Sequence, residues 1–182
     1  GLELGLRIGE ICGLQWGDFD LKPGTLNINR TVCRISYGNG HTKVVIQTPK
    51  TRTSRREIPI PKQLLLMLKK LRGSASNAAW FLSGSESKPT EPRCYRKSIK
   101  AYLKQATVRQ VHPHALRHTF ATTCLQAGCD VKTLSELLGH ANANITLQRY
   151  VHSDLTRKRR EMNRIFSHQV SMRSRKTPSL ME

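Results

Sequence analysis

The sequence has no long apolar run, no leader-like start and no paired cysteines, and each absence excludes a class of protein. No apolar run approaches the roughly 18 residues of a membrane span. The opening Gly-Leu-Glu-Leu-Gly-Leu-Arg contains neither the basic region nor the cleavage site of a signal peptide. None of the five scattered cysteines forms a Cys-x-x-Cys pair, so we expect reduced thiols in a cytoplasmic protein rather than disulfides or a structural zinc site.

Acidic residues are also scarce. The 182 residues include 31 Lys and Arg but only 12 Asp and Glu, which gives a formal net charge of +19. Such an excess indicates a polyanionic partner, most often nucleic acid and less often an acidic membrane. Apolar residues make up 37% of the chain, which is enough for a core and argues against wholesale disorder. The length suits one domain, and because a helical pattern begins almost at Gly1 we expect a fragment of a longer protein.

The first sixty or so residues predict one short helix and a small sheet. Apolar positions at helical spacing indicate a short helix within Gly5 to Gln15. A turn is expected at Tyr37-Gly-Asn-Gly, and the polar segment Thr48 to Ser54 is expected to form a hairpin tip. The three segments of strand-like composition, which would form one antiparallel sheet, are Leu26 to Ile35, Lys43 to Gln47 and Arg55 to Ile60.

After Pro61 the pattern is helical. Pro113, Gly128 and Gly139 supply the start and stop signals of two of the helices, and Asp130 is a capping residue. The expected helices are Gln63 to Leu71, Arg93 to Ala106, His114 to Ala127, Asp130 to Leu138, Thr146 to Val151 and Asp154 to Phe166. The expected fold class is therefore α+β, mostly helical with a small three-stranded antiparallel sheet.

The first motif that indicates chemistry is His114-Ala-Leu-Arg117-His118. His114 and Arg117 are three residues apart, so a helix places both on one face, where an imidazole beside a guanidinium suits a phosphate. An ordinary surface pair explains the same spacing. His114 and His118 have a metal-ligand spacing, but Ala115 stands where zinc proteases carry Glu, and no third ligand follows.

Four further residues lie far apart in the sequence. His140 follows Gly139, which ends a helix, so His140 is expected at an irregular point facing a groove. Tyr150 comes ten residues later, while Arg7 and Lys50 belong to the N-terminal third. Taken singly, the tyrosine suits a half-buried packing residue and each cation an ordinary surface residue.

Taken together and in order, these motifs resemble the tyrosine recombinases, the site-specific DNA recombinases that include phage and conjugative-transposon integrases. The resemblance runs from about Leu2 to Val151 and implies a catalytic domain over 1–168, truncated at its N-terminus, and a flexible basic tail over 169–182. Family members carry DNA-binding domains before the catalytic one, and these are absent from the sequence. The six residues that carry the resemblance are Arg7, Lys50, His114, Arg117, His140 and Tyr150.

The resemblance implies a role for each of these residues. The phenol of Tyr150 would attack a DNA phosphate and form a 3′-phosphotyrosyl link, which preserves the energy of the broken bond. Both arginines and His140 would stabilise the transition state, so neither a metal ion nor another cofactor is expected. Lys50 would act as general acid, with Lys43 as a local competitor, and His114 as general base.

The remaining charge suits contact with the backbone of double-stranded DNA, although a solvated cation is the simpler reading of any one residue. The cations expected at this interface are Arg52, Arg55, Arg56, Lys97, Lys100, Lys104 and Arg149. The basic segment after Tyr150 resembles the family tail that packs on a neighbouring subunit, and strand exchange in the family implies a tetramer on DNA.

Three alternatives stay open. Leu125 to His140 also suits the helix-turn-helix of a non-catalytic regulator, which leaves Arg7, Lys50 and Tyr150 unexplained. A type IB topoisomerase shares the same residue set. The third alternative is a decayed or truncated protein of a mobile element, which would be folded but inactive.

Overall fold

The computed structural model describes residues 1–49, 54–150, 158–160 and 162–167, with the backbone alone at 148–150. The chain divides into two compact units, Gly1–Leu147 and Gln148–Glu182. In the second unit, residues 158–160 and 162–167 are helical, where the sequence predicted its last helix. The expected tail and the boundary after residue 168 lie outside the described residues.

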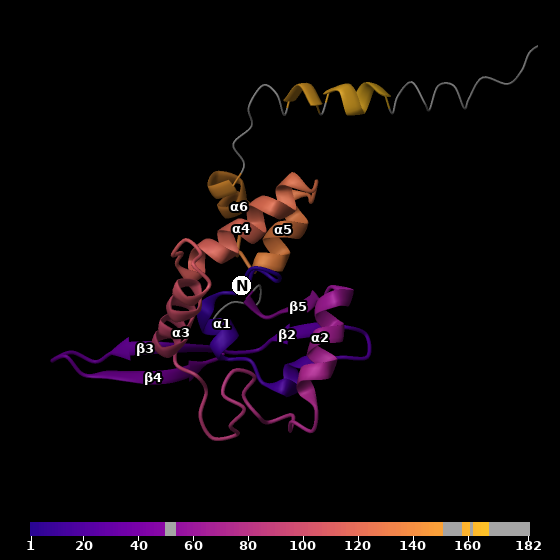
Figure 1. Ribbon diagram of the computed structural model, residues 1–182. Helices are drawn as coiled ribbons and strands as arrows, with labels where there is room; N and C mark the ends of the chain where they lie inside the picture. The colour runs from indigo at the N-terminus through magenta and orange to yellow at the C-terminus, as the bar shows by residue number, and fades with distance from the viewer. Residues whose placement is uncertain (50–53, 151–157, 161, 168–182) are drawn as a thin grey trace, which may run out of the picture. The chain divides into compact units, whose positions relative to one another are not determined.

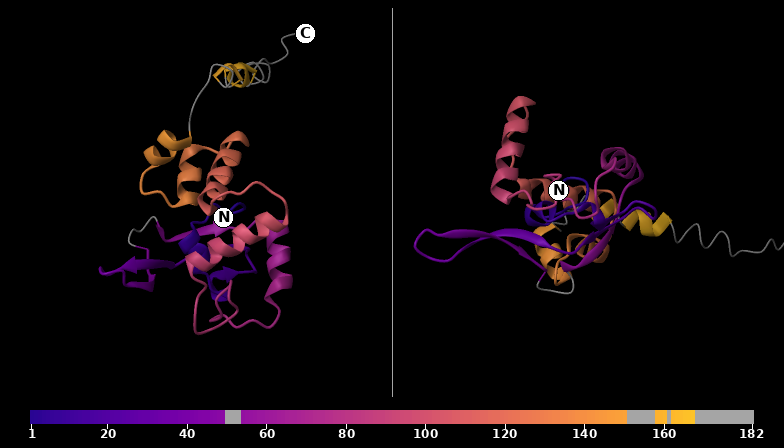
Figure 2. Two further views of the ribbon diagram at one scale, coloured as in Figure 1. Left: turned by 60° about the vertical axis from the view of Figure 1, so that its left-hand side comes forward. Right: turned by 90° about the horizontal axis from the view of Figure 1, so that it is seen from below.

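Five strands of the first unit form two antiparallel sheets (Figure 1). Strands β1 (Phe19–Asp20), β2 (Thr25–Ile28) and β5 (Arg56–Pro59) form a three-stranded sheet in the order β1-β2-β5. Strands β3 (Thr31–Ser36) and β4 (Thr42–Gln47) form a separate hairpin, which projects from the unit (Figure 2). The α+β class and the small three-stranded antiparallel sheet are confirmed.

The membership of that sheet differs from the prediction. The expected strand Leu26 to Ile35 breaks at Asn29 and Arg30, because both side chains bond to the carboxylate of Asp18, at 3.1 and 2.8 Å. Its first half pairs with β5 and its second half with β4, so β4 and β5 lie in different sheets. The segment Thr48 to Ser54 therefore connects two sheets, and its interpretation as a hairpin tip was wrong.

The helices confirm the predicted pattern to within a few residues. Pro92 and Pro113 each open a helix, and the carboxylate of Asp130 accepts a hydrogen bond from the backbone N–H of Thr133 at 2.9 Å. Gly139 ends the next helix at a φ of 62°, a left-handed conformation that favours glycine. The helices are α1 (Ile8–Cys12), α2 (Lys62–Arg72), α3 (Pro92–Gln105), α4 (Pro113–Gln126), α5 (Val131–Leu138) and α6 (Ala143–Tyr150).

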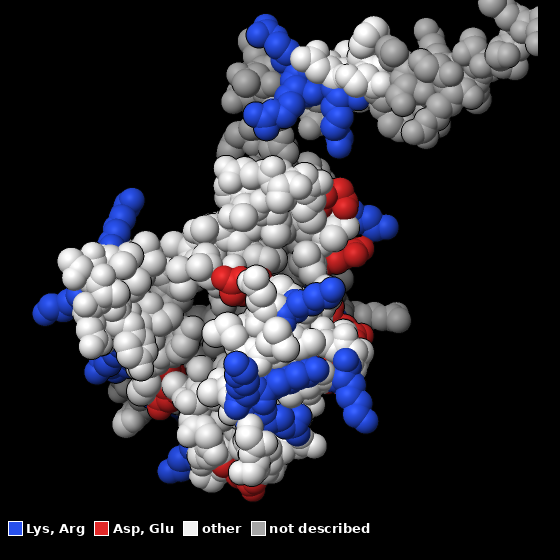
Figure 3. All heavy atoms as spheres, turned by 45° about the vertical axis from the view of Figure 1, so that its right-hand side comes forward, with Lys and Arg blue, Asp and Glu red and all other residues white. Residues whose placement is uncertain are grey.

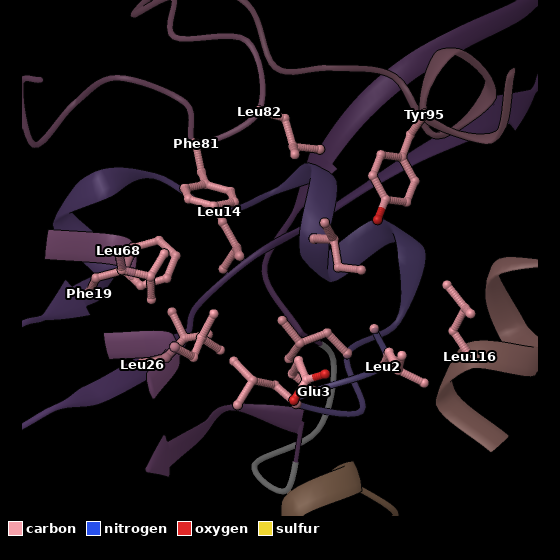
Figure 4. A pocket seen from close by; sticks show the side chains of 15 residues that line it. Leu2, Glu3, Leu14, Phe19, Leu26, Leu68, Phe81, Leu82, Tyr95 and Leu116 are labelled. Atoms are coloured by element: carbon pink, nitrogen blue, oxygen red, sulfur yellow. The ribbon is translucent and has the colours of Figure 1, made fainter. Parts of the chain in front are cut away.

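The main core lies beneath the three-stranded sheet. Leu26, Ile28 and Ile58 are fully buried, and α1 and α2 add leucine and isoleucine side chains. An apolar cavity of about 360 Å³ opens beside this core, with Phe81, Leu82 and Tyr95 among its walls (Figure 4). Its lining is mostly apolar, with Glu3 and Tyr95 among the few polar side chains.

A smaller core joins α4 to α5. The two helices contact each other, and Ala121 and Leu125 of α4 and Leu134 and Leu138 of α5 are all buried. The end of α5 also contacts β5, so this pair of helices adjoins the sheet. All five cysteines are free. None of the helices in the described ranges combines the length and the apolar character that a bilayer crossing needs.

Candidate active site

Arg117 is the buried centre of the candidate site. Its side chain projects from α4, and the residue is only 4% exposed. One terminal nitrogen donates to the carbonyl of Gly5 at 2.6 Å, and the other to the carbonyl of Leu138 at 2.7 Å. Because a guanidinium stays charged at any physiological pH, these carbonyls hold a permanent cation inside the protein.

His140 lies beside this cation. The left-handed turn at Gly139 ends α5 and directs the chain so that His140 Nε2 stands 3.1 Å from Arg117 Nη2. The opposite ring nitrogen, Nδ1, is 2.8 Å from the hydroxyl oxygen of Thr146. The imidazole is therefore fixed at both nitrogens, and the predicted end of the helix before His140 is confirmed.

Arg7 reaches the same place from the other end of the chain. It is the residue before α1, and its side chain is 36% exposed. Its Nη2 donates to the carbonyl of Gly139 at 3.1 Å, while Arg117 donates to the adjacent carbonyl of Leu138. Two guanidinium groups from distant segments thus bind consecutive carbonyls at the end of α5. The structure brings together Arg7, Arg117 and His140.

Glu10 orients Arg7 and is itself held by Arg56. Arg7 donates to this carboxylate from its backbone N–H and from Nη1, both at 2.8 Å. Arg56 of β5 binds the two carboxylate oxygens with its two terminal nitrogens, each at 3.0 Å. Burial by itself would raise the pKa of Glu10, but the hydrogen bonds and charges of Arg56 and Arg7 outweigh it, and the net pKa is lowered.

The placement of Arg56 corrects one prediction. Arg56 was expected to contact DNA phosphates, but its side chain is 7% exposed and its Nε donates to the carbonyl of Leu137 at 2.7 Å. The guanidinium of Arg56 donates its hydrogen bonds to a carboxylate and to backbone carbonyls inside the protein, so it is not directed toward DNA. The sequence carried a signal for this inward placement. In a strand, Arg56, Ile58 and Ile60 point to the same side, and both isoleucines are buried.

Lys50 lies outside the described residues. The residues on either side of the gap do line a cavity of about 260 Å³ next to the arginine site. Arg7 and Glu10 form one part of its wall, and Pro49 and Ser54 form another. The general-acid role of Lys50 stays a prediction.

His114 and Tyr150 are described only in part. His114 is exposed on the first turn of α4, and its ring meets that of His118 edge-on with centroids 5.6 Å apart. Tyr150 is the last residue of α6, and its side chain lies outside the described part of the chain. The predicted roles of both residues therefore remain untested.

The expected DNA-contacting cations divide by exposure. Arg55 and three lysines of α3, Lys97, Lys100 and Lys104, are exposed, as a backbone contact requires. Arg52 and the side chain of Arg149 lie outside the described residues. Lys and Arg cover far more of the face in Figure 3 than Asp and Glu do.

Comparison with known proteins assigns the family. The model of the phage integrase family matches residues 2–157. A tyrosine recombinase XerC-like protein of Caldanaerobacter subterraneus subsp. tengcongensis is 34% identical over 166 residues, which cover 81% of this chain and 42% of the relative. The transposase of transposon Tn916 from Enterococcus faecalis is 28% identical, over 90% of this chain and 43% of that protein. The chain belongs to the phage integrase family, and the predicted resemblance to tyrosine recombinases is confirmed.

Solved structures agree. The Tn1549 transposon integrase in complex with circular intermediate DNA matches with a TM-score of 0.71 and 28% identity, over 90% of this chain and 57% of that one. XerA recombinase matches with a TM-score of 0.60 and 25% identity, over 90% and 54%. The chain spans less than half the length of the curated relatives named above and somewhat more than half of these solved chains.

Proposed function

We propose that this chain is the catalytic part of a site-specific DNA recombinase that integrates or excises a mobile element. The observation that supports this most strongly is the convergence of Arg7, Arg117 and His140 at the end of α5. Two fixed cations beside an imidazole suit one phosphate, the group that carries charge in DNA strand cleavage.

The proposed cleavage step is a direct displacement at phosphorus. The phenol oxygen of Tyr150 forms a bond to the scissile phosphorus as the bond to the 5′ oxygen breaks. The products are a 3′-phosphotyrosyl link and a free 5′ hydroxyl. Attack by a 5′ hydroxyl from another strand reverses the step and releases the tyrosine, so strands are rejoined without ATP.

Two protons move in this step. His114 accepts the proton of the phenol, whose ordinary pKa of about 10 keeps it protonated at neutral pH. Lys50 donates a proton to the departing 5′ oxygen. Arg7 and Arg117 balance the negative charge that spreads over the non-bridging oxygens, the task that metal ions perform in other phosphoryl-transfer sites. EDTA is therefore expected to leave cleavage unchanged.

The partners we propose are double-stranded DNA and further copies of the chain. The exposed lysines of α3 would neutralise backbone phosphates. In the second unit, Met162, Ile165 and Phe166 recur at helical spacing and are 66%, 48% and 68% exposed. An exposed apolar helix face suits contact with a neighbouring subunit, which supports assembly into a tetramer on DNA through this C-terminal segment. The proposed location is the bacterial cytoplasm.

A pool of nicked duplexes of random sequence tests the proposal. A nick just beyond the scissile phosphate lets the short strand with its 5′ hydroxyl diffuse away, which traps the covalent complex. We expect an SDS-stable, nuclease-sensitive adduct with the native chain and none with Tyr150→Phe. Binding of the pool without any adduct would favour the helix-turn-helix regulator, and relaxation of supercoiled plasmid without a defined site would favour a topoisomerase.

A further inference from the structure

Three arginines converge on the end of α5. The helix stops in a left-handed turn, where two backbone N–H groups satisfy the carbonyls of Ser135 and Glu136, each at 3.0 Å. The three carbonyls that follow accept from side chains instead. Each binds a different arginine: Leu137 binds Arg56, Leu138 binds Arg117 and Gly139 binds Arg7.

This end of the helix suits cations for two reasons. The last carbonyls of a helix have no partner within the helix, and the helix dipole makes this end negative. The three arginines come from β5, from α4 and from the residue before α1. The end of α5 is therefore the point at which three distant segments of the chain are joined into one site.

Gly139 makes a close contact that only glycine permits. A Cβ atom at this position would lie 2.7 Å from Nη1 of Arg56 and 3.1 Å from its Cδ and Cζ atoms. Non-bonded heavy atoms are in ordinary contact at about 3.5–4.0 Å, so Arg56 could not keep its place beside a larger residue. From that place Arg56 binds both carboxylate oxygens of Glu10, each at 3.0 Å, and Glu10 in turn holds Arg7.

We propose that Gly139 is a positioning residue, which admits Arg56 to the end of α5 and, through Arg56 and Glu10, sets the direction of Arg7. This inference rests on the proposed function, because Arg7 is one of the cations that would bind the scissile phosphate. Arg7 keeps donors for that task. A guanidinium has five N–H groups, and the bonds from Arg7 to the Glu10 side chain and to the carbonyl of Gly139 use two of them.

Gly128 provides a matched control. It lies just after α4 at a φ of 89°, so it shares the left-handed conformation that disfavours other residues. Within the described part of the chain, a Cβ at Gly128 would meet no packed neighbour within 4 Å. Gly128→Ala therefore introduces backbone strain alone, whereas Gly139→Ala introduces strain and also displaces Arg56.

The first test measures the single-turnover rate of adduct formation on saturating nicked duplexes, with DNA affinity in parallel. We expect Gly139→Ala to slow adduct formation by about 100-fold, the usual effect of misplacing a catalytic group by about 1 Å. Its DNA affinity should change less than about threefold, because the charge of Arg7 is kept. Gly128→Ala should stay near the native values. A native rate for Gly139→Ala, or equal losses of rate in the two variants, would overturn the proposal.

An Arg7→Ala background shows whether Gly139 acts through Arg7. Once that guanidinium is gone, Gly139→Ala should slow adduct formation by no more than about twofold further. A further loss as large as the one in the native background would mean that the substitution acts through His140, Arg117 or the whole fold. That outcome would also overturn the proposal.

A second readout needs no DNA. The Nε–H of Arg56 is buried and bonded to the carbonyl of Leu137, so its hydrogen exchange should be slow. Its NMR signal is assigned by its loss in Arg56→Lys. We expect slow exchange in the native chain and in Gly128→Ala, and fast exchange in Gly139→Ala.

The exchange rates separate the two proposals. Slow exchange in Gly139→Ala would show that Arg56 keeps its place beside alanine, and the inference would fail. If the exchange rates follow the expected pattern but no chain forms an adduct, the proposed function fails and the placement of Arg56 by Gly139 stands.

Discussion

Arg56 and Glu10 form a bidentate ion pair inside the protein, although their positions in the sequence differ by 46. Both oxygens of the carboxylate accept from Arg56, and the same oxygens accept from Arg7 on the other side. Glu10 therefore lies between two guanidinium groups, one interior and one facing the candidate phosphate site. The orientation of Arg7 depends on a residue that has no place in the chemistry itself.

Arg56→Met should destabilise the fold strongly. The substitution leaves the buried carboxylate of Glu10 without its main partner, and breaking a buried pair in this way costs about 3–5 kcal/mol. The free energy of unfolding from urea titration measures the loss. Arg55→Met is the matched control, because Arg55 is the exposed neighbour, and its effect should stay within about 0.5 kcal/mol.

Removing the carboxylate as well should restore part of that loss. In the double variant Glu10→Gln/Arg56→Met no uncompensated charge remains buried, so its unfolding free energy should exceed that of Arg56→Met alone. If the loss of unfolding free energy in the double variant equals the sum of the losses in the two single variants, the pair does not interact in solution.

The contribution of Glu10 to stability should depend on pH. Its pKa is lower in the folded state than the ordinary glutamate pKa of about 4.3, so folding favours the ionised form. The stabilisation is therefore complete above the unfolded pKa and is lost as the pH falls through the folded pKa. The difference in unfolding free energy between the native chain and Glu10→Gln should be constant near neutral pH and shrink in acid. A difference that grows on acidification would contradict the lowered pKa.

Arg7→Ala and Arg117→Ala should impair cleavage much more than binding. Each removes a fixed donor to the transition state, which is worth about 100- to 1,000-fold in rate. Adduct formation and DNA affinity, measured on the same nicked duplexes, give the two losses. Equal losses in both would show that these arginines only anchor DNA.

The α3 lysines should control the salt dependence of DNA binding. Changing Lys97, Lys100 and Lys104 to Gln should reduce the slope of log K against log salt by about 0.9 for each phosphate contact removed. The matched control changes Lys62, Lys69 and Lys70, three exposed lysines of α2, and alters the net charge equally. The account requires the slope of log K against log salt to fall further in the α3 variant than in the α2 variant.

Local signals predicted the helices well. Pro113, Asp130 and Gly139 start or end helices through backbone geometry or capping that a single residue supplies. The break between β2 and β3 had no such signal, because it depends on bonds from Asn29 and Arg30 to a distant carboxylate. Strand pairing is a non-local property, so the sequence predicted the strands better than their partners.

The site was predictable to the extent that family motifs named its residues. The order of the motifs placed Arg7, Arg117 and His140 in one site. In the structure Arg7 and Arg117 bind consecutive carbonyls at the end of α5, and His140 lies beside Arg117. The overall excess of positive charge predicted a DNA contact for both Arg55 and Arg56. Adjacent strand residues face opposite sides, however, and only Arg55 is exposed. The sequence contained no signal for the buried contact between Thr146 and His140, because that contact depends on a ring that follows the turn at Gly139.

The most direct test of the central claim identifies the amino acid that is linked to DNA. The trapped adduct is digested with nuclease and trypsin, and the peptides are sequenced by mass spectrometry. The account predicts a nucleotide joined through its 3′ phosphate to Tyr150, within the tryptic peptide 150–157. A link at any other residue, or through a 5′ phosphate, would contradict it.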